Sequence, residues 1–268
     1  MRRHPVEPLP GDRPRGASSR HGQPPLPPRD RAGSVDRKPP SRPTRRCGDA
    51  VHHAGAVRRS RGAPRRCRSR TPSRGRRPYV IPEGGSNALG SRGYVGLLAE
   101  LLDADSESAS ARWDHIVCAT GSGGTLAGLV LGRRLLRESA SWLETTKMWG
   151  VPVCDDGAYF QRKVHEIARE FETRHPELGP LAILDDEIGV LDVYKGPAYA
   201  VPFAEELDLI RDVARHEGLL LDPVYTGKAF YGLVSEARNG RFAPGARVLF
   251  LHTGGVFSLF AYGRELTS

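Results

Sequence analysis

The segment CATGSGGTLAGLVLG, residues 118–132, has the composition of a phosphate-binding loop. Glycines between a strand and a helix let the backbone turn tightly, so that successive N–H groups point into one concavity. A helix that begins near Thr125 would add the positive end of its dipole, and the hydroxyls of Ser122 and Thr125 are further donors. The spacing is neither GxGxxG nor GxxxxGK(S/T), which disfavours a dinucleotide or a nucleoside triphosphate. A tight connection that binds nothing is the alternative.

The segments around this loop alternate between helix and strand patterns. Apolar residues recur every three to four positions in four segments, which predicts helices over 93–105, 126–138, 158–172 and 203–218. Strand-type runs cover 113–120, 147–154 and 246–253, and a closing helix is expected over 255–263. This alternation predicts an α/β fold in which helices cover both faces of a parallel sheet.

Two of the predicted strands end in Thr-Gly, at Thr120 and at Thr253. In parallel sheets of this kind, ligands bind at the carboxyl ends of the strands. We therefore expect the loops that follow both strands to lie on the same edge of the sheet.

Five segments occur in the order and spacing of one known family. They are PYVIPEGGSNALGSRGYVGLLAEL, ATGSGGTLAGLVLG, VYKGPAYAVP, EGLLLDPVYTGKAFYGLV and VLFLHTGGVFSLFAY. On these segments the chain resembles the D-cysteine desulfhydrase and 1-aminocyclopropane-1-carboxylate deaminase family over about residues 78–268. The resemblance implies a tryptophan-synthase-β-like fold (fold type II), pyridoxal 5'-phosphate as cofactor, a small amino acid as substrate and a homodimer as assembly.

The resemblance also assigns roles to individual residues. Tyr225, in the DPVY segment, is the residue expected to face the substrate. The cofactor is expected to contact the phosphate loop and two threonines near its ring, namely Gly121, Ser122, Gly123, Gly124, Thr125, Thr226 and Thr253.

Thr226 and Thr253 separate the two activities of the family. The deaminases carry Glu and Leu at these positions, whereas this chain is similar to the desulfhydrases. A carboxylate near the pyridine nitrogen keeps that nitrogen protonated and makes the ring a strong electron sink, and a hydroxyl makes it a weaker one. Loss of thiolate from the β-carbon needs less delocalisation than opening of a cyclopropane ring. The threonines therefore favour conversion of D-cysteine to pyruvate, sulfide and ammonia.

Three alternatives to this reaction remain. Deamination of 1-aminocyclopropane-1-carboxylate and a cysteate sulfo-lyase activity belong to the same family. The third is a non-catalytic protein with a basic tail that binds nucleic acid.

The family's Schiff-base lysine has no counterpart in this sequence. The family carries it in an early GGNK…RK segment, followed by a Ser-Asn motif, and there it holds the cofactor aldehyde and then acts as base. Lys38 lies in VDRKPPSRP, which matches nothing in that segment. We therefore predict an incomplete version of the fold that is inactive as this chain. No motif supports the remaining lysines as replacements, namely Lys147, Lys163, Lys195 and Lys228.

Structural roles are expected for several other polar residues. Tyr199 either lines the site or packs, and Lys228 is interpreted as a structural charge partner. His252 is interpreted as a positioned, hydrogen-bonded residue and His165 as part of a solvated helix face. The acidic pairs near 155 and 185 are expected in turns rather than at a metal, and no metal is predicted.

Residues 1–77 differ in composition from the rest. They contain 22 Lys and Arg against 5 Asp and Glu, and 13 of the 22 prolines, but no Phe, Trp or Tyr. Such a segment buries too little apolar surface to offset its chain entropy, which predicts disorder. A nucleic-acid tail, a targeting peptide and GC-rich DNA read out of frame are three explanations, of which the third is favoured because Arg, Pro, Gly, Ala and Ser dominate. Residues 78–268, which are net acidic, form the predicted enzyme domain.

The remaining compositional features predict a cytoplasmic protein without a membrane span. The chain has no signal-peptide h-region and no apolar run of 18 residues. The four cysteines, at 47, 67, 118 and 154, lack the spacing of a zinc site or a redox pair, which favours free thiols.

Overall fold

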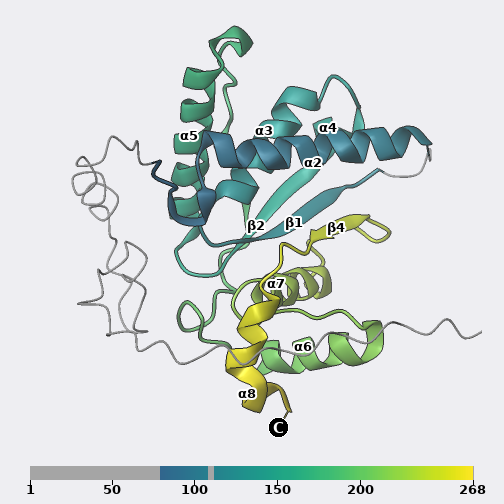
Figure 1. Ribbon diagram of the computed structural model, residues 1–268. Helices are drawn as coiled ribbons and strands as arrows, with labels where there is room; N and C mark the ends of the chain where they lie inside the picture. The colour runs from purple at the N-terminus through teal and green to yellow at the C-terminus, as the bar shows by residue number, and fades with distance from the viewer. Residues whose placement is uncertain (1–78, 108–111, 268) are drawn as a thin grey trace, which may run out of the picture. The chain divides into compact units, whose positions relative to one another are not determined.

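The computed structural model describes residues 79–107 and 112–267, which all belong to one compact unit, 58–268. The predicted segment 1–77 lies outside the described residues. Within them, four strands form a single parallel sheet in the order β3-β2-β1-β4 (Figure 1). The strands are β1 (His115–Thr120), β2 (Lys147–Pro152), β3 (Gly189–Val190) and β4 (Val248–Leu251). The predicted parallel sheet is thus confirmed, and the two-residue strand β3 is an addition.

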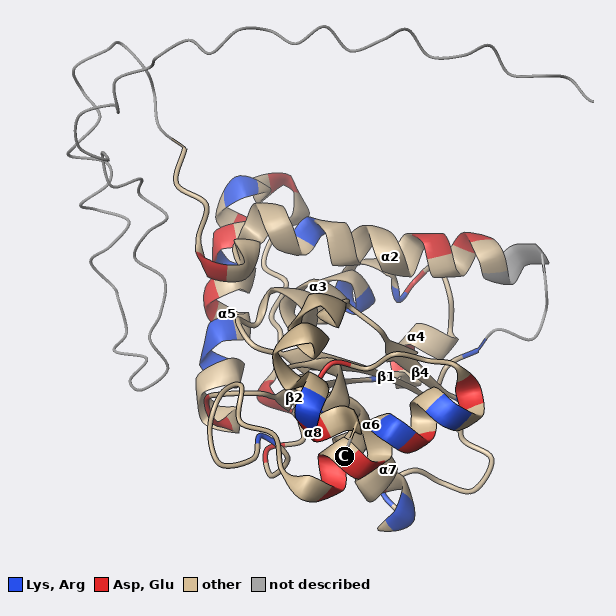
Figure 2. Cartoon of the chain, turned by 60° about the horizontal axis from the view of Figure 1, so that its bottom comes forward, with Lys and Arg blue, Asp and Glu red and all other residues tan. Residues whose placement is uncertain are grey.

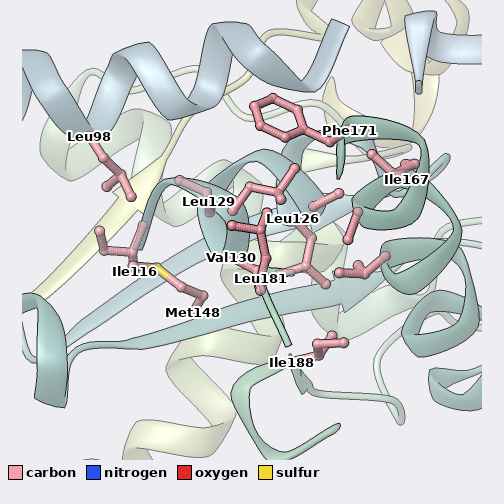
Figure 3. Close-up of a cluster of buried hydrophobic side chains, with 14 of the residues drawn as sticks. Leu98, Ile116, Leu126, Leu129, Val130, Met148, Ile167, Phe171, Leu181 and Ile188 are labelled. Carbon is pink, nitrogen blue, oxygen red and sulfur yellow. The ribbon is translucent and has the colours of Figure 1, made fainter. Parts of the chain in front are cut away.

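Alternate residues of β1 face two separate cores. Ile116 and Cys118 belong to one cluster of buried side chains, and Val117 and Ala119 belong to a second one. The first cluster, drawn in Figure 3, is covered by α2 (Ala88–Glu107), α3 (Gly124–Leu136) and α5 (Gly157–Arg174). The second is covered by α7 (Thr226–Arg238), against which α6 (Ala204–Glu217) packs. Helices cover both faces of the sheet, as predicted.

Helices α2 and α3 pack closely because glycines remove side chains from their interface. A Cβ at Gly128 of α3 would overlap the Ser91 carbonyl oxygen of α2, and a Cβ at Gly132 would lie 2.9 Å from Leu98 Cδ1. The two helices form the broadest helix–helix contact of the described chain. Their packing fixes the first residues of α3, which form the end of the predicted phosphate loop.

The local signals at helix ends behave largely as predicted. Asp156 is the N-cap of α5, where its Oδ1 accepts the Tyr159 amide at 2.7 Å, so that this acidic residue lies in a turn. Helix α6 ends at Gly218, whose φ of +65° suits glycine. The closing helix expected over 255–263 is instead a 3₁₀ helix, η5 (Val256–Tyr262), followed by the short α8 (Gly263–Thr267). Gly254 and Gly255 have positive φ before it, and Gly255 lies so close to the Asp222 carboxylate that the start of this segment is set by that contact.

The remaining described elements are short. They are η2 (Glu83–Gly85), α4 (Trp142–Thr145), η3 (Pro176–Leu178) and η4 (Asp185–Glu187). Charged residues lie mainly on the helices, while most of the sheet is uncharged (Figure 2). None of the helices in the described part of the chain is both long and apolar enough to cross a membrane.

Strand β4 forms an edge of the sheet. Within the described residues it pairs only with β1, and all four of its residues are half-buried although their sequence is Val-Leu-Phe-Leu. An apolar strand that is fully buried in a sheet would have neighbours on both sides. The apolar residues of β4 are therefore less covered than those of β1, which has a neighbouring strand on each side.

Candidate cofactor site

The predicted phosphate loop connects β1 to α3 at the carboxyl end of β1. Gly123 is the N-cap of α3, with a φ of +87° that favours glycine. Among residues 79–107 and 112–267, no protein atom accepts a hydrogen bond from the amides of Ser122, Gly123 or Thr125. Three unpaired amides at the positive end of a 13-residue helix fit the phosphate of pyridoxal phosphate. The described residues thus fit the cofactor at this loop.

Ser86, which the sequence analysis did not identify as a site residue, supports the loop from outside. Its Oγ lies 2.7 Å from Ser122 Oγ and accepts the Gly124 amide at 3.1 Å. Ser91 Oγ donates to the Gly124 carbonyl at 2.9 Å. Ser86 is almost fully buried. It is followed by Asn87, whose Oδ1 accepts the Gly90 amide in the first turn of α2. The signal that could have identified it is its position in the first of the five family segments.

Tyr225 lies against the beginning of the phosphate loop. A Cβ at Gly121 would lie 3.3 Å from Cε1 of the Tyr225 ring, so glycine at 121 lets the ring approach the backbone. The hydroxyls of Tyr199 and Tyr225 are hydrogen-bonded, and their ring centroids are 5.9 Å apart. Of the two interpretations of Tyr199, this contact favours the one that places it in the site.

Tyr199 keeps its proton at neutral pH. Two causes raise the pKa of Tyr199 well above its ordinary value: its burial, which has the larger effect, and its hydrogen bond to Tyr225. At neutral pH Tyr199 is therefore a neutral phenol, and one proton lies between the two hydroxyl oxygens.

Thr226 is fully buried at the first position of α7. Its Oγ1 donates to Asp222 Oδ1 at 2.7 Å and accepts the Asp222 amide at 2.9 Å. Oδ2 of Asp222 accepts the amides of Val224 and Tyr225, each at 2.9 Å. Asp222 is thus the capping carboxylate of the turn that presents Tyr225, a role that the sequence analysis did not assign.

Asp222 also joins this turn to the loop after β4. Ser258 Oγ donates to Asp222 Oδ2 at 3.1 Å, and a Cβ at Gly255 would overlap the carboxylate. Thr253 is exposed in this loop, and His252 bonds through Nε2 to the Leu220 carbonyl oxygen at 2.8 Å, as expected of a positioned histidine.

The loops after β1 and β4 share one edge of the sheet, because these two strands are parallel neighbours. This confirms the prediction made from the two Thr-Gly sequences. The structure brings Tyr225 to Gly121 and links Thr226 through Asp222 to Gly255 and Ser258, whereas Thr253 makes no hydrogen bond within the described residues. A role for Thr226 and Thr253 near the cofactor ring stays a prediction.

The described lysines differ in how close they come to this edge. Lys147 is exposed at the start of β2, the opposite end of the sheet. Lys195 Nζ lies 3.5 Å from the Asp155 carbonyl oxygen, and Lys163 pairs with Glu166 at 3.4 Å, while its Cγ would lie 2.9 Å from a Cβ at Gly123. Lys228 is fully buried, and its Nζ donates to the Lys195 and Ala198 carbonyl oxygens.

The other predicted polar groups have no metal-binding arrangement. His165 Nε2 pairs with Asp185 Oδ1 at 2.6 Å on a half-buried helix face. Within the described ranges, no three His, Cys, Asp or Glu residues come together in a way that could hold a metal ion. Cys118 and Cys154 are free thiols, and burial raises their pKa to about 12 and about 11.

Comparisons with known proteins identify a family for this chain. The model of the family described as pyridoxal-phosphate dependent enzymes matches residues 41–254. This match begins inside the Arg- and Pro-rich segment, earlier than the start near residue 78 that the five segments indicated.

Individual relatives are similar over a shorter range. A putative 1-aminocyclopropane-1-carboxylate deaminase of Thermotoga maritima is 43% identical over 196 residues, which are 72% of this chain and 56% of the relative. A D-cysteine desulfhydrase of Serratia proteamaculans is 39% identical over 196 residues, which are 72% of this chain and 55% of the relative.

A crystal structure of a homologue of 1-aminocyclopropane-1-carboxylate deaminase superposes with a TM-score of 0.59 at 38% identity, covering 72% of this chain and 54% of that one. The chain spans about half the length of the curated relatives it matches. With its α/β fold and these matches, the chain belongs to the pyridoxal-phosphate-dependent enzyme family that includes proteins named 1-aminocyclopropane-1-carboxylate deaminase and D-cysteine desulfhydrase.

Proposed function

We propose that this chain supplies the phosphate loop and the tyrosine pair of a pyridoxal-phosphate-dependent lyase, and that its reaction is α,β-elimination of D-cysteine. The observation that carries the proposal is a set of three amides, of Ser122, Gly123 and Thr125, that have no acceptor among the described residues and lie at the N-terminus of α3 beside the Tyr225 ring. A doubly charged phosphate is the part of the cofactor that such amides bind.

The bound cofactor would serve as the electron sink that makes the substrate α-proton acidic. The residues of this chain perform the surrounding tasks. The loop amides hold the phosphate, and Tyr225 holds a proton that the leaving sulfide can take when the Cβ–S bond breaks. Tyr199 shares that proton and orients the Tyr225 hydroxyl.

Hydroxyls rather than carboxylates at Thr226 and Thr253 favour elimination over ring opening. The hydrogen bond from Thr226 to Asp222 supports the same preference. The Thr226 hydroxyl already donates its proton to Asp222 Oδ1, so its oxygen can only accept a further hydrogen bond. A weak electron sink suffices for loss of thiolate. Sulfide, pyruvate and ammonia are the proposed products.

Deamination of 1-aminocyclopropane-1-carboxylate is the second candidate, since the relative that is 43% identical bears that name. Cysteate sulfo-lyase activity is a further possibility within the family. The three reactions give different products, so one assay set distinguishes them. Sulfide from D-cysteine, 2-oxobutyrate from the cyclopropane amino acid and sulfite from cysteate are measured in parallel.

We further propose that this chain binds the cofactor but turns over little substrate by itself. Lys147, Lys195 and Lys228 hold their amines away from the loop or bury them against carbonyl oxygens. Lys163 touches Gly123 with its stem but directs its ammonium to Glu166. A basic tail that binds nucleic acid and a homodimer both stay predictions.

Cofactor binding tests the proposal directly. Pyridoxal phosphate is titrated into the full chain, into Gly123→Ala and into Gly240→Ala, and binding is followed by equilibrium dialysis. Both glycines have positive φ, of 87° and 77°, so the alanine in either variant introduces a similar backbone strain of about 1–2 kcal/mol. Only Gly123 lies in the loop. We expect about tenfold weaker binding in Gly123→Ala, a loss of roughly 1.4 kcal/mol, and unchanged binding in Gly240→Ala.

Equal affinity of both variants would contradict the loop assignment, and absence of binding to the unaltered chain would contradict the cofactor assignment. Borohydride reduction followed by peptide mapping then tests the lysine proposal. We expect no stoichiometric label on any lysine of residues 79–267. A full label on Lys163 would show that this chain carries its own substitute.

A further inference from the structure

We infer that Lys228 is a positioning residue that holds the 195–201 turn in place, so that the Tyr199 hydroxyl meets Tyr225. This inference rests on the proposed function, which gives the tyrosine pair its role. It assigns a task to a buried cation that takes no part in binding the cofactor phosphate.

The ammonium group of Lys228 binds the turn at two points. Its Nζ donates to the Lys195 carbonyl oxygen at 2.6 Å and to the Ala198 carbonyl oxygen at 2.9 Å. Both acceptors precede Tyr199 in the chain. A compact cation with three donors suits two carbonyl oxygens that converge from different directions.

Helix α7 thereby positions both tyrosines. Tyr225 is its N-cap residue, and Lys228 lies three positions later, about one turn along the same helix. One end of α7 presents Tyr225 directly, and the Lys228 side chain fixes the turn that presents Tyr199. The hydrogen bond between the two hydroxyls joins the N-terminus of α7 to the 195–201 turn.

The turn has little else to define its position. Tyr199 and Val201 are 41% and 44% exposed, so side-chain burial holds the turn only in part. Ala200 has a φ of +58°, a left-handed conformation that costs a non-glycine residue energy. The turn is closed by the Val201 amide on the Ala198 carbonyl at 3.1 Å, and Tyr262 donates to the Ala200 carbonyl. Polar anchors therefore decide where Tyr199 lies.

Burying an ammonium group costs free energy, because the group loses its hydration. An apolar side chain of similar volume would avoid the loss of hydration. Lys228 is fully buried, and both carboxyl oxygens of Glu206 on α6 are buried without a hydrogen-bond partner among the described residues. Glu206 therefore does not bind the ammonium, whose protons remain for the two turn carbonyls.

The test follows the tyrosine pair by fluorine NMR of the full chain carrying 3-fluorotyrosine at position 225. Lys228→Met keeps the length of the stem and removes the ammonium, and Lys147→Met is the matched control on the exposed start of β2. We expect Lys228→Met to shift the fluorine signal as far as Tyr199→Phe does, and Lys147→Met to leave it in place. In the Tyr199→Phe background, Lys228→Met is expected to add no further shift.

The outcomes that overturn the inference are defined without any activity measurement. A fluorine signal that stays at its original position in folded Lys228→Met would show that Lys228 does not act on the pair. A full additional shift in the Tyr199→Phe background would show that it acts by another route. If Lys228→Met does not fold, Lys228→Gln takes its place, and failure of both to fold would assign Lys228 to general stability and reject the inference.

Failure of the proposed function looks different. It appears as absence of pyridoxal phosphate binding in the unaltered chain, whatever the fluorine signal does. Coupling of the fluorine signal to Lys228 in a chain that binds no cofactor would leave the positioning role established and the function rejected.

Discussion

Ser258 donates a hydrogen bond to Asp222 across 36 positions of the chain, at 3.1 Å. The same carboxylate accepts three backbone amides of the turn before α7 and the Thr226 hydroxyl. A single buried side chain therefore joins the segment that presents Tyr225 to the loop after β4. These hydrogen bonds satisfy the acceptor oxygens of a buried carboxyl group, which would otherwise be costly to bury.

Asp222→Asn should destabilise the fold strongly. An amide nitrogen would face N–H donors where an oxygen now accepts, and bonds to a charged acceptor are each worth about 1.5–3 kcal/mol. We expect a loss of at least about 2 kcal/mol in the free energy of unfolding, measured by urea denaturation. The matched control is Asp212→Asn on α6, whose carboxylate is 63% exposed and 3.9 Å from Arg215. A loss no larger than that of the control would show that the Asp222 network carries little stability.

Ser86→Ala should weaken pyridoxal phosphate binding. The change removes the acceptor of the Gly124 amide and the partner of the Ser122 hydroxyl, so the loop loses its support from the α2 side. One such hydrogen bond is worth about 1 kcal/mol, which corresponds to roughly fivefold in the dissociation constant. Ser139→Ala, at an exposed position after α3, is the control for dialysis measurements. Equal affinities for the two variants would mean that the loop holds its shape without Ser86.

Glu206 should make stability fall as the pH rises from about 5 to about 8. Burial raises the pKa of Glu206 from 4.5 to about 8. The folded state therefore binds a proton that the unfolded state releases above 4.5, and the resulting stability is complete below that value and lost as the pH passes 8. The steepest slope for one proton is about 1.4 kcal/mol per pH unit.

The measurement is urea denaturation of the unaltered chain and Glu206→Gln across this pH range. We expect a flatter profile in Glu206→Gln, because its amide does not titrate. Burial lowers the pKa of Lys228, so its titration makes stability rise with pH between that lowered pKa and the ordinary lysine value and opposes the effect of Glu206. Parallel profiles for the two proteins between pH 5 and 8 would show that Glu206 is ionised throughout.

Gly128→Ala should destabilise the packing of α3 on α2. The added methyl group would overlap the Ser91 carbonyl oxygen, and overpacking of this kind costs about 1–3 kcal/mol. Gly93→Ala in α2 is the control, since no atom lies within 4 Å of its added Cβ and alanine is the better helix former by roughly 0.5–1 kcal/mol. Thermal unfolding should therefore shift down for the first variant and up for the second. A neutral Gly128→Ala would mean that the two helices can separate at no cost.

Local pattern was enough to predict three strands and four helices of the described fold, but helix α7 (Thr226–Arg238) was not predicted. The strands near 113–120, 147–154 and 246–253 and four main helices follow from apolar spacing, because each depends on residues adjacent in sequence. Strand β3 was not predicted, since two residues carry no periodicity. The closing segment was expected to be helical and is mostly 3₁₀, because its glycines and its contacts with the Asp222 turn decide its geometry.

The candidate site divides in the same way. The sequence by itself determined the phosphate loop, since its amides, its glycines and the helix that follows are consecutive residues. Only the tertiary structure decided that Ser86 supports this loop, that Tyr199 bonds to Tyr225 and that the Lys228 ammonium holds the turn between them. These contacts join residues 26 to 36 positions apart, and such distances are closed by the packing of helices on the sheet rather than by any local preference.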